Sequence, residues 1–184
     1  FSPAKINLWL EIQGVLPNGY HQLETWMVPI AIFDIVVLRP SLPLGVSVPG
    51  HPELENENNL IYRATVAFFR QLGKRPRGLW EIQKNIPVGA GLGGGSSNAA
   101  SALRLLNRAH DHPLSPRQLH QLAGDLGADV PFFLYNSAAQ VEGIGEQITP
   151  LQNFPKLSII LINPGVPVDT AWAYQQWDLT RMYP

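Results

Sequence analysis

Apolar and polar side chains alternate along the first part of the chain. Over residues 4–12 every second side chain is apolar, which is typical of a strand with one buried face. We expect the apolar set to be buried, with Lys5 and Asn7 sharing the opposite face. Asn18-Gly19 follows, and Asn-Gly between apolar runs indicates a hairpin whose second strand covers residues 20–30.

Further along, short apolar runs mix with helical patterns. The other expected strands cover residues 32–38, 79–83, 138–142, 147–151 and 157–162, the last of them central in a sheet. Residues 41–57 are expected to form a loop with a short edge strand. Helices are expected from Asn58 or Asn59 to Leu72, over 96–110, from Ser115 to about Gly124, and over 169–177. Strands grouped first, with hairpins rather than regular βαβ units, predict an α+β fold.

Composition limits the function classes. The 184 residues suffice for one domain, or for one domain and the beginning of another. The net charge is −1, so neither nucleic acid nor a membrane surface is an expected partner. The chain lacks cysteine, which excludes thiolate chemistry and disulfides, and no apolar run is long enough to span a bilayer. It begins at Phe1 without a signal peptide, and we expect it to be incomplete at that end and cytosolic.

The run VGAGLGGGSS at residues 88–97 carries the main chemical signal. Glycine allows positive φ and lets a ligand approach the backbone closely. A helical pattern follows at once, and a helix N-terminus attracts anions through its unpaired N–H groups and its dipole. The run therefore predicts a phosphate-binding loop, with Ser96 and Ser97 capping the helix behind it.

Common phosphate loops do not fit this run. Gly95 stands where a Walker A loop needs lysine, and a dinucleotide-binding loop needs a strand leading directly into the glycines. A protein-kinase glycine loop is followed by a strand rather than a helix. A flexible linker would not open directly into an amphipathic helix.

Three segments resemble the GHMP small-molecule kinases. KNIPVGAGLGGGSSNAA at 84–100 is similar to their ATP-binding segment. PAKINL at 3–8 with NGYH at 18–21, and LGADVPFF at 126–133, are similar to the substrate and catalytic segments of one branch, which acts on a cytidine diphosphate-linked methylerythritol. NPG at 163–165 is a weaker similarity. Two positions depart from that branch: Asn18 replaces its usual aspartate, and Leu16 stands where a basic residue is common.

The resemblance implies a fold, a reaction and a set of site residues. It implies a ribosomal-protein-S5-domain-2-like N-terminal domain over 1–152, and the beginning of a second α/β domain over 153–184. The implied reaction is ATP-dependent phosphorylation of the substrate's 2-hydroxyl in non-mevalonate isoprenoid synthesis, with Mg²⁺ as cofactor, in a bacterial cytoplasm or plastid stroma. Lys5 and Asp129 would be catalytic, and Asn7, Tyr20 and His21 would bind the substrate. The ATP-binding residues would be Asn59, Lys84, Pro87, Gly89, Ala90, Gly91, Leu92, Gly93, Gly94, Gly95, Ser96 and Ser97.

Taken singly, several of these residues have simpler explanations. Lys5 can be a solvated strand lysine, and Asp129 can be a helix cap. His110-Asp111-His112 lies at a helix end without a third ligand cluster, so no protein metal site is predicted. Two rival functions stay open: another kinase of the same superfamily, and a nucleotide-binding fragment without turnover, because family chains are longer. The oligomeric state is not predicted.

Overall fold

The computed structural model describes residues 1–17, 19–166, 168 and 170–182. In these residues six strands form one sheet in the order β3-β4-β2-β5-β6, with β1 paired to β2. The strands are β1 Ser2–Val15, β2 His21–Arg39, β3 Gly45–Ser47, β4 Leu79–Gln83, β5 Ala139–Gly143 and β6 Gln147–Pro150. The helices are α1 Leu60–Gln71, α2 Gly94–Ala109, α3 Pro116–Leu126, α4 Phe132–Tyr135 and α5 Thr170–Met182, with a 3₁₀ turn at Pro52–Leu54.

Strand β2 is the spine of the sheet. Its residues 21–34 pair with β1, its residues 23–27 pair with β5, and its residues 35–39 pair with β4. The two strands expected over 20–30 and 32–38 are therefore one continuous strand, because β4 takes over as a partner where β1 ends. The expected edge strand is β3, which runs parallel to β4.

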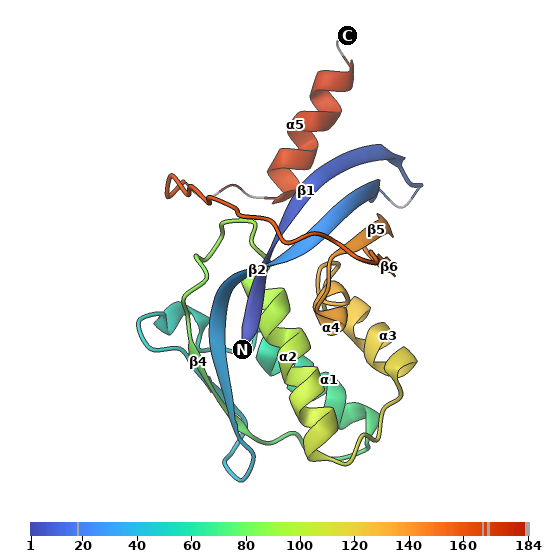
Figure 1. Ribbon diagram of the computed structural model, residues 1–184. Coiled ribbons are helices and arrows are strands. Elements are labelled where there is room, and N and C mark those ends of the chain that lie inside the picture. The colour runs from blue at the N-terminus through green and yellow to red at the C-terminus, as the bar shows by residue number, and fades with distance from the viewer. Residues whose placement is uncertain (18, 167, 169, 183–184) are drawn as a thin grey trace.

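The core lies between the sheet and helices α1–α4. Helix α2 is central, since it packs against α1, α3, α4, β1 and β2 (Figure 1). Trp80 of β4 is fully buried, and its indole Nε1 donates a 2.8 Å hydrogen bond to Thr65 Oγ1 of α1. Other fully or nearly fully buried side chains are Ile61, Phe68, Ile82, Leu103, Leu106, Val130, Phe132 and Val141. Ser2 Oγ of β1 lies 2.7 Å from Ser97 Oγ and 2.8 Å from Asn98 Oδ1, and these contacts fix the beginning of α2 against β1.

Local signals set two helix starts as expected. Asn59 caps α1, because its Oδ1 accepts a 3.0 Å hydrogen bond from the Ile61 amide. Ser115 and Gln118 form a capping box at the start of α3, with Pro116 as the first helical residue. Helix α3 continues to Leu126, two residues beyond the predicted end.

The predicted burial of β1 is wrong. Leu8 and Leu10 of the apolar set are exposed, whereas Lys5 of the polar set is buried. Strand register shifts between Asn7 and Trp9, and such a bulge breaks strict alternation of faces. The Lys5 and Asn7 side chains are turned toward Asp129 and Thr25 of the folded domain, so Lys5 is buried there, whereas Glu11 of the same polar set stays exposed.

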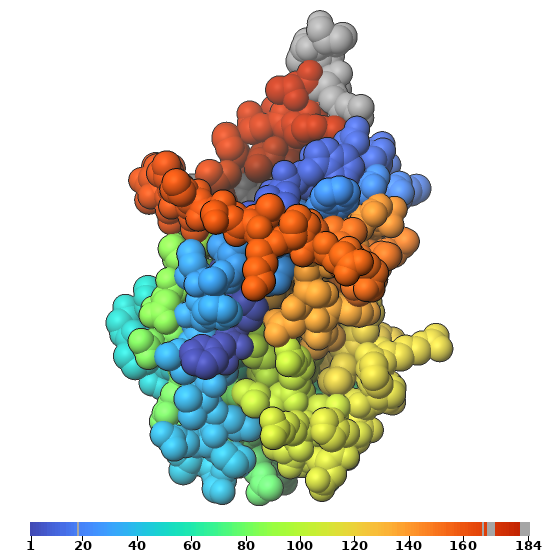
Figure 2. Space-filling model, viewed as in Figure 1, coloured from blue at the N-terminus to red at the C-terminus, as the bar shows by residue number. Residues whose placement is uncertain are grey.

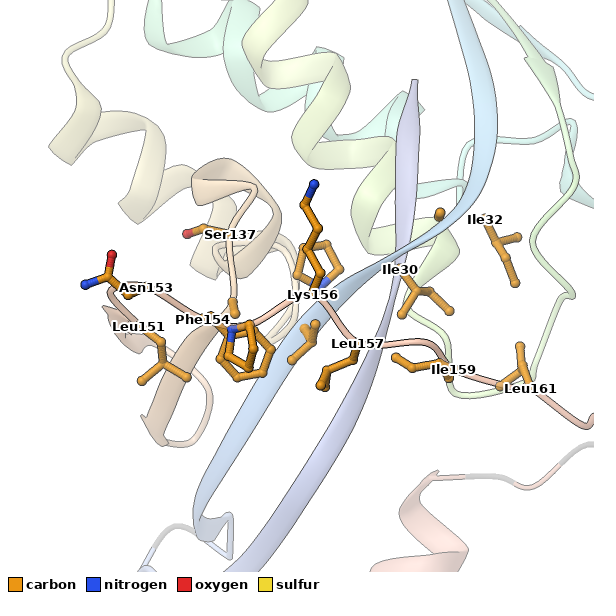
Figure 3. Close-up of a pocket in the computed structure, with 15 residues that line it drawn as sticks. Ile30, Ile32, Ser137, Leu151, Asn153, Phe154, Lys156, Leu157, Ile159 and Leu161 are labelled. Carbon is orange, nitrogen blue, oxygen red and sulfur yellow. The ribbon is translucent and has the colours of Figure 1, made fainter.

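Residues 157–162 are extended but form no strand. Among the described residues none pairs with them through a ladder, and Ile160 is 90 % exposed. The segment crosses the molecule between α5 and the main body (Figure 2). It passes over β2 with Leu157 and Ile159 beside Ile30, and the two surfaces line an open cavity of about 780 Å³ (Figure 3). The prediction of a central strand is wrong, because an apolar run forms a strand only where a neighbouring strand supplies hydrogen bonds.

The chain after β6 ends in helix α5, which lies beside the far end of the β1–β2 hairpin (Figure 1). The helix begins at Thr170; Asp169, where it was predicted to start, lies outside the described residues, as does Asn18 of the hairpin turn. The assignment of 153–184 to a second domain stays a prediction. In the described part of the chain, no helix is both long enough and apolar enough to cross a membrane.

Candidate active site

The glycine-rich loop connects β4 to α2. Gly89, Gly91 and Gly93 adopt φ values of 71°, 71° and 68°, a left-handed conformation that favours glycine over other residues. Gly93 is the N-cap of α2 and makes no side-chain cap hydrogen bond. Ser96 and Ser97 therefore lie inside the first turn, and the prediction that they cap the helix is wrong. The Ser97 amide donates to the Gly93 carbonyl, but the amides of residues 94–96 have no acceptor within the helix and can donate to a ligand.

Two lysines lie close to the loop: Lys5 of β1 and Lys84, which directly follows β4. A Cβ placed on Gly93 would lie 3.1 Å from Lys5 Cγ and 2.8 Å from Phe133 Cζ. A Cβ placed on Gly94 would lie 3.0 Å from Lys84 Nζ. The backbone of β1 also holds the loop, since the Lys5 amide donates a 2.9 Å hydrogen bond to the Leu92 carbonyl. The start of α2 thus combines amide donors with two lysine ammoniums, each of which is also paired with a carboxylate, Lys5 with Asp129 and Lys84 with Asp34. Amide and ammonium donors together suit a phosphate group.

A cavity of about 370 Å³ lies on one side of the loop. Apolar side chains Val48, Leu54, Leu60 and Ile82 form part of its wall. The predicted ATP-binding residues that line it are Asn59, Lys84, Pro87, Gly89, Ala90, Gly91, Leu92, Gly93, Gly94, Gly95 and Ser96. Ser97 is not among the lining residues; its buried hydroxyl lies 2.7 Å from Ser2 Oγ, so it fixes β1 to α2 instead.

Lys5, Asp129 and Asn7 form a second cluster beside the loop. Lys5 Nζ lies 3.3 Å from Asp129 Oδ2 and donates a 2.8 Å hydrogen bond to Asn7 Oδ1. The Asp129 side chain is 31 % exposed, whereas that of Lys5 is 9 % exposed. Thr25 orients Asn7, because its Oγ1 accepts a 2.7 Å hydrogen bond from Asn7 Nδ2 and donates one to the Trp9 carbonyl. The cluster therefore holds a partly exposed carboxylate beside a buried ammonium.

A second cavity, of about 570 Å³, lies across the loop and shares residues 89–92 with the first. Tyr174 and Trp177 of α5 line it. His21 stacks on Tyr174 with ring centroids 4.5 Å apart, and its Nε2 lies 2.9 Å from Asp178 Oδ1. Burial raises the pKa of Tyr174, and the negative charge of Asp129 raises it further. Asp129 is therefore within electrostatic range of the aromatic side of this cavity.

Tyr20 lies at the far end of the hairpin and is 60 % exposed. Of the predicted substrate residues, Asn7 belongs to the Lys5–Asp129 cluster and His21 contacts α5, whereas Tyr20 belongs to neither group. His21, its neighbour, is mostly covered by α5, with 11 % of its side chain exposed.

Four residues near the site were not predicted from the sequence. Asp34 and Thr25 are fully buried polar residues of β2, Asn98 is a buried polar residue of α2 that lines the first cavity, and Tyr174 covers His21. A charged residue within the apolar run 32–38 was an available signal for Asp34. The other three carry no comparable signal, because their positions depend on contacts far apart in the chain.

Comparison with known proteins gives a consistent family. Residues 59–137 match the GHMP kinases N terminal domain. A 4-diphosphocytidyl-2-C-methyl-D-erythritol kinase of Deinococcus radiodurans is 44 % identical over 183 residues, which cover 98 % of this chain and 60 % of the relative. A kinase of the same name from Oleidesulfovibrio alaskensis is 41 % identical over 96 % of this chain and 55 % of the relative. The chain thus spans little more than half the length of these two relatives.

Solved structures agree with this result. A crystal structure of a 4-(cytidine 5'-diphospho)-2C-methyl-D-erythritol kinase matches with a TM-score of 0.76 and 35 % identity, over 95 % of this chain and 62 % of that one. Mevalonate kinase of Methanococcus jannaschii has the same fold, with a TM-score of 0.60 at 12 % identity over 83 % of this chain and 55 % of that one. The predicted α+β fold is confirmed. The chain carries the GHMP kinases N terminal domain over residues 59–137, and its fold is that of the N-terminal part of these kinases.

Proposed function

We propose that this chain carries the ATP-binding and catalytic side of a kinase for 4-diphosphocytidyl-2-C-methyl-D-erythritol. The reaction transfers the γ-phosphoryl group of ATP to the 2-hydroxyl of that substrate, a step of non-mevalonate isoprenoid synthesis. The relatives in Deinococcus and Oleidesulfovibrio that bear this kinase name support the choice of substrate. A bacterial cytoplasm is the proposed location over the plastid stroma, since these relatives are bacterial.

One observation carries the proposal. Lys5 contacts the glycine-rich loop through its main-chain amide and Asp129 through its side chain. Lys5 therefore holds the glycine-rich loop, which would bind phosphate, next to the Asp129 carboxylate, which can accept a proton. Phosphoryl transfer depends mostly on such positioning and on stabilisation of charge.

The chemistry of each group follows from its place. Asp129 accepts the proton of the substrate's 2-hydroxyl. At the same time the hydroxyl oxygen bonds to the γ-phosphorus of ATP, and the bond between that phosphorus and the ADP oxygen breaks. The Lys5 ammonium pairs with Asp129 and offsets negative charge on the transferring group. Loop amides and Lys84 hold the phosphates of ATP on the other side. Asn7, fixed by Thr25, orients the methylerythritol part of the substrate.

The residues present fit a magnesium ion held mainly by ATP. In the described residues no three His, Cys, Asp or Glu side chains gather to form a metal site. Mg²⁺ commonly keeps several waters and binds substrate phosphates with few protein ligands. The Ser96 hydroxyl, which lines the nucleotide cavity, would be such a ligand. When bound, Mg²⁺ supplies neutralisation of phosphate charge.

Replacing Lys84 by methionine should weaken ATP binding about tenfold and change the affinity for cytidine 5'-diphosphate by less than twofold. Lys84 lines the nucleotide cavity and lies at the start of α2, whereas Tyr174, on which His21 stacks, lines the other cavity. Loss of one charge-assisted contact commonly has this magnitude. Isothermal titration of both ligands measures it; equal losses for the two would contradict a role toward ATP.

Replacing His21 by alanine should weaken binding of cytidine 5'-diphosphate roughly tenfold and leave ATP binding unchanged. His21 stacks on Tyr174 and meets Trp177 edge to face, and an aromatic cluster of this kind suits a planar base; one stacking contact is commonly worth about 1–3 kcal/mol. His120→Ala is the matched control, since that ring contacts Tyr135 and the Glu146 carbonyl. A loss as large in the control would remove His21 from the cytidine site.

Product formation tests the proposed function directly. The chain is mixed with ATP, Mg²⁺ and the cytidylyl substrate, and ADP release is measured beside mevalonate and homoserine as competing acceptors. Turnover of the cytidylyl substrate supports the proposal. Preference for another acceptor would favour a different kinase of the family, and ATP binding without any turnover would favour a nucleotide-binding fragment.

A further inference from the structure

Asp34 is a buried charge beside the nucleotide cavity. It lies in β2 and is 0 % exposed. Its Oδ1 accepts hydrogen bonds from the amides of Asn85, at 2.8 Å, and Ile86, at 2.9 Å. Its Oδ2 forms an ion pair with Lys84 Nζ, whose side chain is 6 % exposed. One carboxylate therefore holds both the side chain and the main chain of the segment that leads into the glycine-rich loop.

Stability alone does not account for this arrangement. Burying two charges costs solvation free energy that their attraction often fails to exceed, and apolar residues of similar volume commonly serve a fold equally well. Strands β2 and β4 themselves carry a different ion pair, between Arg39 and Glu81, and that pair is exposed at the end of the β2–β4 ladder away from Lys84. The buried pair is the one that reaches the nucleotide cavity, so its location calls for a role there.

The pair fixes where the Lys84 ammonium stands. Lys84 Nζ lies 3.0 Å from a Cβ placed on Gly94, the first residue of α2, and both residues line the nucleotide cavity. Ile86, held through its amide by Asp34, is buried in a cluster with Ala4 and Leu92. The Leu92 carbonyl in turn accepts a hydrogen bond from the Lys5 amide. Asp34 is thus connected to the loop along two routes, one ionic and one through packed backbone.

We propose that Asp34 is a positioning residue for ATP: from outside the cavity it aligns the Lys84 ammonium and the 85–86 backbone with the helix end that receives the phosphates. The inference rests on the proposed function only in taking ATP as the ligand of that cavity. Asp34 itself touches no ligand, and its effect passes through Lys84.

The test is a double-mutant cycle on ATP affinity. Asp34→Asn keeps the volume and an oxygen for the two amides but places an amide next to the ammonium. We expect Asp34→Asn and Lys84→Met each to weaken ATP binding about tenfold, and the double variant to bind about as weakly as either one. Affinity for cytidine 5'-diphosphate should change by less than twofold. Isothermal titration at a temperature well below each variant's Tm gives these values without catalysis.

The outcomes separate this inference from the proposed function. Glu81→Gln is the matched control, because it breaks the exposed β2–β4 ion pair and should leave ATP affinity unchanged. Independent, multiplicative losses in the cycle, or a lowered Tm for Asp34→Asn with normal ATP affinity, would overturn the positioning role and leave the kinase proposal standing. Failure of the unaltered chain to bind ATP would overturn both. ATP binding without turnover, with the expected coupling, supports the positioning role alone.

Discussion

Replacing Asp129 by asparagine should lower turnover roughly a hundredfold or more and leave ATP affinity within about twofold. The amide keeps the shape of the side chain but cannot accept the hydroxyl proton, and a positioned base commonly contributes a factor of this size. Asp129 lies 3.3 Å from Lys5 Nζ and outside the lining of the nucleotide cavity, so binding of ATP should persist. Initial rates at saturating ATP, together with titration of ATP, measure the two effects.

Asp125→Asn is the matched control for this change. Asp125 is an exposed residue of α3, four positions before Asp129, and it faces α1 rather than the glycine-rich loop. Its substitution should leave turnover and ATP affinity unaltered. Turnover of the Asp129→Asn protein close to that of the unaltered chain would remove Asp129 as the base, whatever the control shows.

Replacing Gly93 by alanine should destabilise the fold and nearly abolish turnover. The left-handed φ of 68° costs a side-chain residue roughly 1–2 kcal/mol, and the new Cβ would overlap Phe133 at 2.8 Å, which adds about 1–3 kcal/mol of overpacking. Any relief requires Phe133 or Lys5 to move, and Lys5 is the partner of Asp129. Denaturant unfolding and initial rates measure the two consequences.

Gly91→Ala separates backbone strain from steric overlap. Gly91 has φ of 71°, yet a Cβ there would meet no atom within 4 Å. The free energy of unfolding of the Gly91→Ala protein should therefore fall only by the roughly 1–2 kcal/mol that the left-handed conformation costs. Equal losses of stability for the two variants would show that the contacts of Gly93 with Phe133 and Lys5 are unimportant.

Local signals predicted much of this fold. The capping box at Ser115, the cap at Asn59 and the glycine run before α2 each act within a few residues of the chain, so their chemistry can be read directly. The hairpin of β5 and β6 was likewise predicted within one residue of its observed bounds. In each case the neighbours that decide the structure are also neighbours in sequence.

Long-range contacts explain the failures. An alternating pattern separates the two faces of β1 but does not tell which face the rest of the chain covers, and the bulge before Trp9 leaves no mark in the sequence. Residues 157–162 have the composition of a strand, yet a strand also needs a partner. The pairing of Asp34 with Lys84 joins residues 50 positions apart. The catalytic and binding roles assigned from motifs stay predictions, although Lys5, Asn7 and Asp129 do lie together.

The main-chain and side-chain contacts of Lys5 come from chemically independent parts of the residue. Its peptide nitrogen anchors the Leu92 carbonyl, and every amino acid except proline retains that nitrogen's hydrogen. A chemist can therefore exchange the ammonium for a neutral, shorter or isotopically labelled group at this position while the anchor persists. Substitutions at this one position can therefore separate the effect of the side-chain charge from that of the main-chain hydrogen bond that holds the loop.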